Sequence, residues 1–188
     1  MEENINVSFP DACSRQGAVF SPCGNHRYIL WRRWNDNSRL LLYVLLNPST
    51  ADGENEDRTT RRCRYFAEQY GAGGMIIVNV FSFVATRPDE LKRHLQDLRV
   101  SGNGGLHEEA AFAEVNARYV REAFRHVEAV VAAWGRPPFA SSDFTAMQSL
   151  LKHSSLPVLC LGTTCRGFPR HPSRVAAATQ LVAYHTAL

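Results

Sequence analysis

The sequence predicts an α/β protein in three layers, with a mostly parallel, four-stranded central sheet flanked by helices and an N-terminal hairpin. Continuous apolar runs alternate with segments of helical spacing, and they occur at residues 40–46, 75–80, 127–134 and 157–161. Strands that are apolar on both faces are typical of sheets covered by helices on both sides. The repeated order of strand and helix favours parallel strands joined by crossover helices. Polar, proline-containing loops follow the first and last runs, where open α/β sheets bind their ligands.

The N-terminal part of the chain predicts an extension followed by a strand pair. Residues 1–26 mix polar residues with prolines and glycines and are expected to form an extension, whereas residues 27–188 are expected to form a single domain. An apolar run at 28–34 predicts a strand, and the turn residues at 35–38 direct the chain back. We therefore expect this strand to form a hairpin with the one at 40–46.

Helical segments separate the apolar runs. Asp57 is a favourable N-cap for the first of them, because its carboxylate can accept from the free N–H groups of the first turn. The longest segment repeats its apolar residues at helical spacing. The expected helices cover residues 58–70, 88–98, 107–126, 139–152 and 174–184.

Composition limits the classes of function. The 188 residues carry a formal net charge of +3, which permits a nucleic-acid partner without requiring one. An odd count of five cysteines without a CxxC pair is typical of a reducing cytosol, and the acidic N-terminal end predicts no secretion signal. Cys160 and Cys165 lack a second ligand pair at metal-binding spacing, so no metal site is expected. No run approaches the roughly 18 apolar residues of a membrane span, and we expect a cytoplasmic protein.

Four short motifs, each at a predicted strand end, resemble those of the uracil-DNA glycosylase superfamily. In chain order they are Asn47-Pro48, Val78-Asn79, Ala133-Trp134-Gly135 and His171-Pro172-Ser173. The resemblance implies a four-stranded parallel sheet in which Asn47 positions the attacking water, Asn79 contacts the base and His171 stabilises the departing base. From about Arg27 onward, the chain also resembles an uncharacterised bacterial domain family with the motifs Leu-Asn-Pro-Ser-Thr-Ala-Asp and Gly-x-Pro-x-His-Pro.

The catalytic candidates lie in the two loops that follow the first and last apolar runs. Asn47 lies between a buried strand and Pro48, so its amide is held in place to orient a water; the alternative is a turn asparagine that bonds its own backbone. Asp52 caps no predicted element and is the acid–base candidate, whereas Asp57 is interpreted as the helix cap. His171 lies in a proline-stiffened loop and can donate to a leaving oxygen; the alternative is a surface histidine.

Further polar residues are candidates for contacts with a base or with phosphates. Asn79 ends a buried strand, and a buried amide needs hydrogen-bond partners such as those on a base edge; the alternative is a structural bond to loop backbone. The substrate-binding candidates are Pro48, Ser49, Asn79, Phe81, Thr86, Asn116 and Ser173. The nucleic-acid-binding candidates are Arg58, Arg61, Arg62, Arg166, Arg170 and Arg174, with Phe168 as an apolar wedge. A solvated basic face with ion pairs is the alternative for the arginines.

Together these features predict a DNA glycosylase-like enzyme. It would flip a modified or mismatched base into a pocket between the strand-end loops and hydrolyse its N-glycosidic bond. The expected partner is double- or single-stranded DNA, the expected state is a monomer, and neither a cofactor nor a metal is required. Two alternatives stay open: hydrolysis of a free nucleoside or nucleotide, and a non-catalytic module that binds modified nucleic acid.

Overall fold

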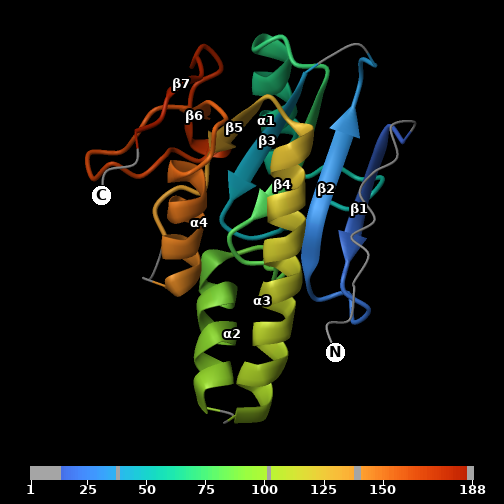
Figure 1. The fold of residues 1–188 in the computed structure, drawn as a ribbon, viewed down its shortest axis with the longest axis vertical. Helices are drawn as coiled ribbons and strands as arrows, with labels where there is room; N and C mark the ends of the chain where they lie inside the picture. Colours follow the sequence, from blue (N-terminus) through green and yellow to red (C-terminus); the bar gives the residue numbers. More distant parts are fainter. Residues whose placement is uncertain (1–13, 37–38, 101–102, 138–140, 186–188) are drawn as a thin grey trace.

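The computed structural model describes residues 14–36, 39–100, 103–137 and 141–185 (Figure 1). Within these residues, one seven-stranded sheet has the strand order β1-β2-β4-β3-β5-β6-β7. The strands are β1 (Gln16–Phe20), β2 (Arg27–Arg33), β3 (Leu40–Leu45), β4 (Gly74–Asn79), β5 (Ala129–Ala132), β6 (Val158–Cys160) and β7 (Val182–Ala183). The helices are α1 (Arg58–Gln69), α2 (Pro88–Val100), α3 (Asn103–Ala123) and α4 (Ser142–Lys152), with 3-10 turns η1 (Phe124–His126) and η2 (Pro172–Arg174).

The protein is α/β, but the prediction of a four-stranded, mostly parallel sheet is wrong. The sheet is mixed: β4, β3, β5 and β6 are parallel neighbours, while β1 and β2 extend it antiparallel at one edge and β7 does so at the other. The apolar runs identify strands that are buried on both faces. They do not identify the edge strands, because β1 is only partly buried and β7 has two residues, both exposed.

The expected hairpin between the segments 28–34 and 40–46 does not form. Strand β4 lies between β2 and β3, and it pairs Leu30 with Ile77 on one side and Tyr43 with Ile77 on the other. The hairpin in this region joins β1 to β2 instead, so the sheet begins within the predicted extension. A turn signal shows where the chain reverses, but burial decides which strand it pairs with; residues 1–13 and 37–38 lie outside the described part of the chain.

The predicted helix at 174–184 is also wrong. After η2 the chain runs through turns, and β7 then pairs with β6, with Leu159 opposite Ala183. The Tyr184 N–H donates to the Val158 carbonyl at 2.8 Å, and the Tyr184 ring meets Trp134 edge to face. Anchoring of this aromatic residue in the core therefore takes precedence over the helical propensity of the alanines before it.

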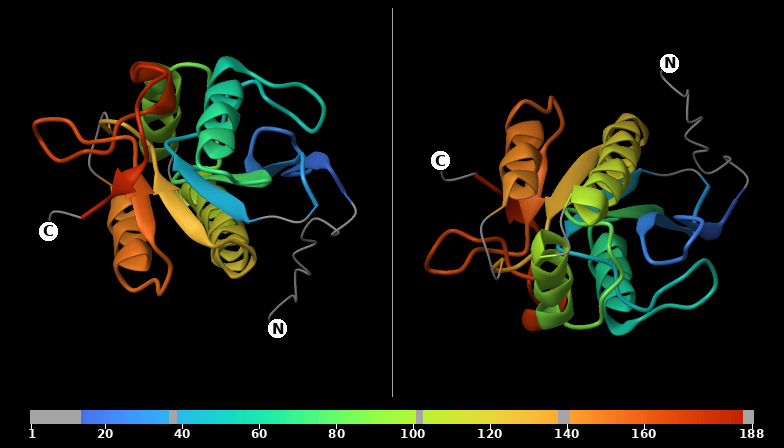
Figure 2. Two further views of the ribbon diagram at one scale, coloured as in Figure 1. Left: turned by 90° about the horizontal axis from the view of Figure 1, so that it is seen from above. Right: turned by 90° about the horizontal axis from the view of Figure 1, so that it is seen from below.

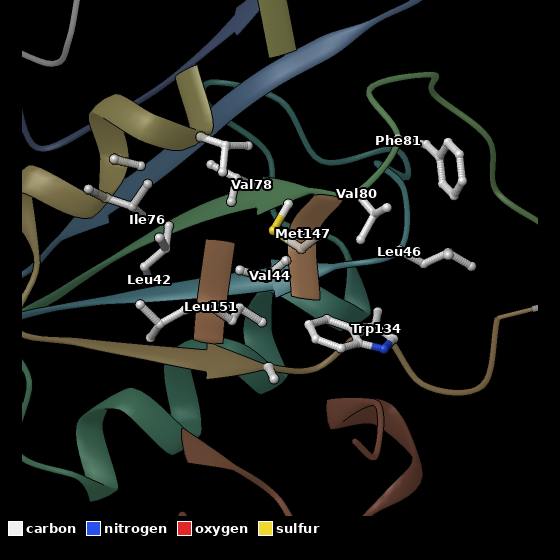
Figure 3. Close-up of a cluster of buried hydrophobic side chains, with 14 of the residues drawn as sticks. Leu42, Val44, Leu46, Ile76, Val78, Val80, Phe81, Trp134, Met147 and Leu151 are labelled. Carbon is white, nitrogen blue, oxygen red and sulfur yellow. The ribbon is translucent and has the colours of Figure 1, made fainter. Parts of the chain in front are cut away.

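Helices cover both faces of the sheet (Figure 2), and alternate residues of the central strands belong to two separate core clusters. Leu41 and Tyr43 face α1 and pack in one cluster with Cys63. Leu42 and Val44 point to the other face, where α3 and α4 cover the sheet, and Figure 3 shows them beside Met147 and Leu151 of α4. The predicted helix cap is confirmed, because the Asp57 carboxylate accepts from the Thr60 N–H at 2.7 Å. No helix in the described residues is long and apolar enough to cross a membrane.

Gly74 begins β4 at a point where no larger residue fits. A Cβ at this position would lie 2.4 Å from Leu40 Cδ2 and 2.9 Å from the Arg32 carbonyl oxygen. We expect Gly74→Ala to lower the free energy of unfolding by about 1–3 kcal/mol, because the backbone neighbour cannot move aside. Gly53→Ala is the matched control, since its Cβ would lie 3.6 Å from its nearest neighbours. Urea unfolding of both variants measures this, and equal stability would show that the strand pair adjusts freely.

The sheet order places a topological switch point at β3. The chain leaves β3 through α1 to reach β4 on one side, and it later returns through β5 on the other side. In open α/β sheets, ligands bind beyond the carboxyl ends of the strands at such a point. Figure 3 shows Leu46 and Trp134 directly beyond the arrowheads of β3 and β5. The fold therefore predicts a ligand site in the loops at this edge of the sheet.

Candidate functional site

A cavity of about 430 Å³ opens at this edge, and we call it the strand-end pocket. Its walls come from the loops after β3, β4, β5 and β6, from the start of β2 and from the first turn of α1. Several residues expected from the sequence line it, namely Asn47, Ser49, Thr86, Arg170, His171, Ser173 and Arg174. The two loops that are far apart in the sequence thus meet at one cavity.

Other predicted residues lie outside the strand-end pocket. Phe81 and Asn116 line a second cavity of about 470 Å³, which also contacts Met147 of α4. Asn79 is buried, and Pro48 is buried with its carbonyl oxygen accepting from the Ala85 N–H at 2.9 Å. Neither of these two residues lines the strand-end pocket. The remaining residues that the structure places outside this lining are Asp52, Arg58, Arg61, Arg62, Arg166 and Phe168.

Asn47 is held rigidly at the end of β3. Its Nδ2 donates to the Pro48 carbonyl at 2.9 Å and to the Ala85 carbonyl at 2.7 Å, and these two bonds orient the amide. The opposite atom, Oδ1, accepts no hydrogen bond from any residue that the structure describes. A fixed acceptor that lines a cavity can bind and orient a water molecule.

His171 is held in one tautomer by its own loop. It is the N-cap of η2, and its Nδ1 accepts from the Ser173 backbone N–H at 3.3 Å, with Ser173 Oγ 2.8 Å away. Because Nδ1 accepts an N–H, the proton of the neutral ring must sit on Nε2. Burial, followed by the neighbouring Arg174 charge, lowers the pKa of His171 to about 4. At neutral pH the residue is therefore an uncharged donor whose Nε2–H is free of partners among the described residues.

The lowered pKa of His171 makes stability depend on pH. The pKa falls from 6.5 to about 4 on folding, so the unfolded chain takes up this proton first as the pH decreases. The contribution of His171 to stability is fully present above the pKa of the unfolded chain. It is lost as the pH falls from there through the pKa of the folded protein. We expect acidification to lower the free energy of unfolding of the native protein by up to about 3 kcal/mol more than that of a His171→Asn variant. Urea unfolding at neutral and mildly acidic pH measures the difference, and parallel losses in the two proteins would contradict it.

Asp52 and Asp57 occupy different environments. The Asp52 Oδ1 accepts from the backbone N–H groups of Glu54 and Asn55 at 2.8 and 2.7 Å, and the Asn55 bonds contribute most to lowering its pKa to about 2. This carboxylate closes its own loop and does not line the strand-end pocket. Asp57 lines the pocket and is half-buried, and only one of its oxygens is used by the bond from Thr60.

The lining also contains residues that sequence reasoning did not assign to a site, among them Arg27, Asp57 and Trp134. The sequence assigns Asp57 to the helix cap and shows Trp134 only within the Ala133-Trp134-Gly135 motif. The structure shows that both line the cavity and that Trp134 also packs in the core. The available signal for Arg27 was a lone cation at the start of an apolar strand. Helix capping and core packing are visible locally, but a second role at a cavity depends on tertiary structure.

The arginines near the pocket divide into two kinds. Arg136, Arg170 and Arg174 are exposed and line the strand-end pocket, so they form a cationic rim. Arg62 instead holds the His171 loop in place, because its Nε and Nη2 donate to the carbonyls of Pro172 and Val175 at 3.3 and 2.9 Å. Exposed arginines at the rim and an arginine that holds the loop are thus adjacent in this region.

Among the comparisons with known proteins, only the family comparison found a match. A search of the curated proteins found no match, and neither did a search of the solved structures. One family model, described as protein of unknown function (DUF1643), matches residues 27–173, which include every lining residue of the strand-end pocket except Arg174. Because the match covers most of the 188 residues, the chain belongs to the DUF1643 family.

Proposed function

We propose that this protein is a DNA glycosylase-like hydrolase that cleaves the N-glycosidic bond of a nucleotide in the strand-end pocket. The observation that carries the proposal is that Asn47 and His171 line the same cavity, one as a fixed acceptor and the other as a neutral donor. The resemblance of the Asn47-Pro48 and His171-Pro172-Ser173 motifs to the uracil-DNA glycosylase superfamily supports the same reaction class.

The pocket offers a separate group for each part of the hydrolysis. A water that donates to Asn47 Oδ1 attacks C1′ of the sugar, the C1′–N bond breaks, and its electron pair stays on the base. The negative charge is delocalised onto base oxygens, and His171 Nε2–H donates to one of them. The proton that the water loses passes to the Asp57 carboxylate and then to the base nitrogen. The products are the free base and a sugar with a C1′ hydroxyl.

Asp57 takes the role that the sequence suggested for Asp52. Asp57 lines the cavity, whereas all the hydrogen bonds of the Asp52 carboxylate lie within its own loop. A carboxylate beside the sugar also stabilises the positive charge that develops at C1′ as the bond breaks. The two functions need one negative charge at one position, and Asp57 supplies it.

The exposed rim favours a nucleotide within DNA over a free one. Arg136, Arg170 and Arg174 lie at the surface around the pocket, where they can contact phosphates on either side of a flipped nucleotide. A free nucleotide offers only its own phosphate groups to such a rim. Binding should therefore weaken steeply with added salt for DNA and much less for a mononucleotide.

The deciding experiment is an abasic-site assay. The protein is incubated with DNAs that carry a panel of natural and phage-type modified bases, and abasic sites are revealed by alkaline cleavage. Free nucleotides are tested in parallel by detection of the released base, and Asn47→Ala and His171→Ala are included throughout. We expect abasic sites on at least one DNA and loss of product in both variants. No product from any substrate, or equal activity in the variants, would refute the proposal.

A further inference from the structure

Arg27 is a buried cation that forms no ion pair with the described residues, although the Asp57 charge acts on it from a greater distance. Its side chain is on the first residue of β2 and is 3% exposed, yet no carboxylate among the described residues lies within ion-pair distance of it. Burial lowers the pKa of Arg27 to about 10, so the guanidinium stays charged at neutral pH. Burying a charge is unfavourable unless it is paired.

Arg32 of the same strand shows how this protein pairs a buried arginine. Arg32 is 4% exposed and lies 3.6 Å from the Glu56 carboxylate. Its guanidinium also donates to the Asp52 carbonyl at 2.7 Å. Unlike Arg27, it does not line the strand-end pocket. Of these two buried arginines, the one that lacks an ion pair is therefore the one that lines the cavity.

The hydrogen bonds around Arg27 leave donors without acceptors. Nη1 donates to the Ala51 carbonyl at 2.8 Å and Nη2 to Asn79 Oδ1 at 3.3 Å. Because Oδ1 of Asn79 must face the guanidinium, its Nδ2 is a second donor, and both Nδ2 and Arg27 Nε are buried without a partner among the described residues. Unpaired buried groups of this kind are rare and costly. A cation flanked by unpaired donors suits an anionic oxygen.

Burial places Arg27 on the inner side of the pocket. The lining residues Leu45, Thr60 and Trp134 are buried with it, whereas Arg136 and Arg174 are exposed at the rim. A nucleotide whose phosphates contact the exposed rim directs its base toward the buried lining. The anionic oxygen that meets Arg27 therefore belongs to the base and not to a phosphate.

We propose that Arg27 recognises an anionic oxygen on the base of the substrate. The negative charge is either present before cleavage, on an acidic base, or develops on the base as the C1′–N bond breaks. This inference rests on the proposed function, because it takes the inner pocket to be the base site. It adds a specificity: bases that present acceptor oxygens at this position are favoured over bases that present an amino group.

The test compares two pyrimidines in calorimetric binding titrations. Barbiturate is an anion at neutral pH and mimics a departing base, whereas uracil is its neutral relative. We expect the native protein to bind barbiturate about 10- to 100-fold more tightly than uracil, and to keep this preference at high salt because the site is buried. Arg27→Met should lose the preference and Arg27→Lys should reduce it. Arg32→Lys is the matched control and should retain it.

Each outcome decides the inference. An equal affinity of the native protein for barbiturate and uracil would overturn it, and so would a preference that survives in Arg27→Met. If Arg27→Met does not fold, as judged by circular dichroism, Arg27→Lys and the native comparison carry the test. Binding of barbiturate requires no cleavage. A preference for barbiturate that depends on Arg27, in a protein that releases no base, would therefore refute the proposed reaction but not the role of Arg27. On a DNA that is cleaved, slower release by Arg27→Lys with unchanged DNA affinity would indicate charge that develops during cleavage.

Discussion

We expect the His171→Ala protein to release base about 10²- to 10³-fold more slowly than the native protein. The half-buried imidazole lines the pocket, is neutral at neutral pH and presents Nε2–H as a donor. Such a donor needs no reorientation when charge develops on the departing base, and this is why its loss affects the transition state more than binding. Single-turnover rates of base release, measured with saturating protein, isolate this step from product release.

Two further variants show whether the effect comes from the donor. Ser173→Ala removes Oγ but keeps the backbone N–H that fixes the tautomer, so we expect a loss of activity much smaller than that of His171→Ala. Cys165→Ala changes an exposed residue outside the pocket lining and should match the native rate. A His171→Ala protein that binds DNA more weakly but cleaves it at the native rate would assign His171 to binding instead.

The second large effect is expected from Asp57→Asn. Asparagine caps helices as well as aspartate does, so the α1 N-terminus should be preserved and stability should change little. The variant removes the negative charge that lines the pocket, and with it the acceptor for the proton of water. We expect base release to slow by about 10²-fold or more, as for loss of a general base. Thermal unfolding alongside the rate measurement separates the chemical effect from a structural one.

Asp52→Asn provides the matched comparison. The Asp52 carboxylate accepts within its own loop and does not line the pocket, and an amide oxygen can still accept two of these bonds. We expect activity within about twofold of the native rate, since substitutions away from the reacting groups have small effects. If Asp52→Asn were inactive and Asp57→Asn fully active, the acid–base role would return to Asp52.

The central part of the sheet could be predicted from the sequence because its signal is local. Runs such as 40–46 and 75–80 are apolar throughout, and they form β3 and β4. The pairing of β2 with β4 and of β7 with β6 could not be predicted, since it joins segments that are distant in sequence or too short to show a pattern. Turn residues and helical propensity indicated a hairpin and a final helix there, and tertiary packing overrode both.

The site was predictable to the extent that it lies at strand ends. Asn47 and His171 each follow a predicted strand, and the carboxyl ends of β3 and β6 share one edge of the sheet. The contribution of Arg27 could not be seen in this way, because it depends on which carboxylates lie near a buried guanidinium. The place of Asp57 in the site could not be predicted, because one of its oxygens caps α1 and this role alone explains the residue in the sequence, while the residue also lines the cavity.

The most direct test of a common site for Asn47 and His171 is a crystal structure of the His171→Ala protein bound to a DNA that the native protein cleaves. We expect the target nucleotide to be flipped into the strand-end pocket, with its sugar C1′ facing Asn47 and its base toward Arg27 and Trp134. A base seated in the second cavity beside Phe81 and Asn116, or outside both cavities, would contradict the site described here.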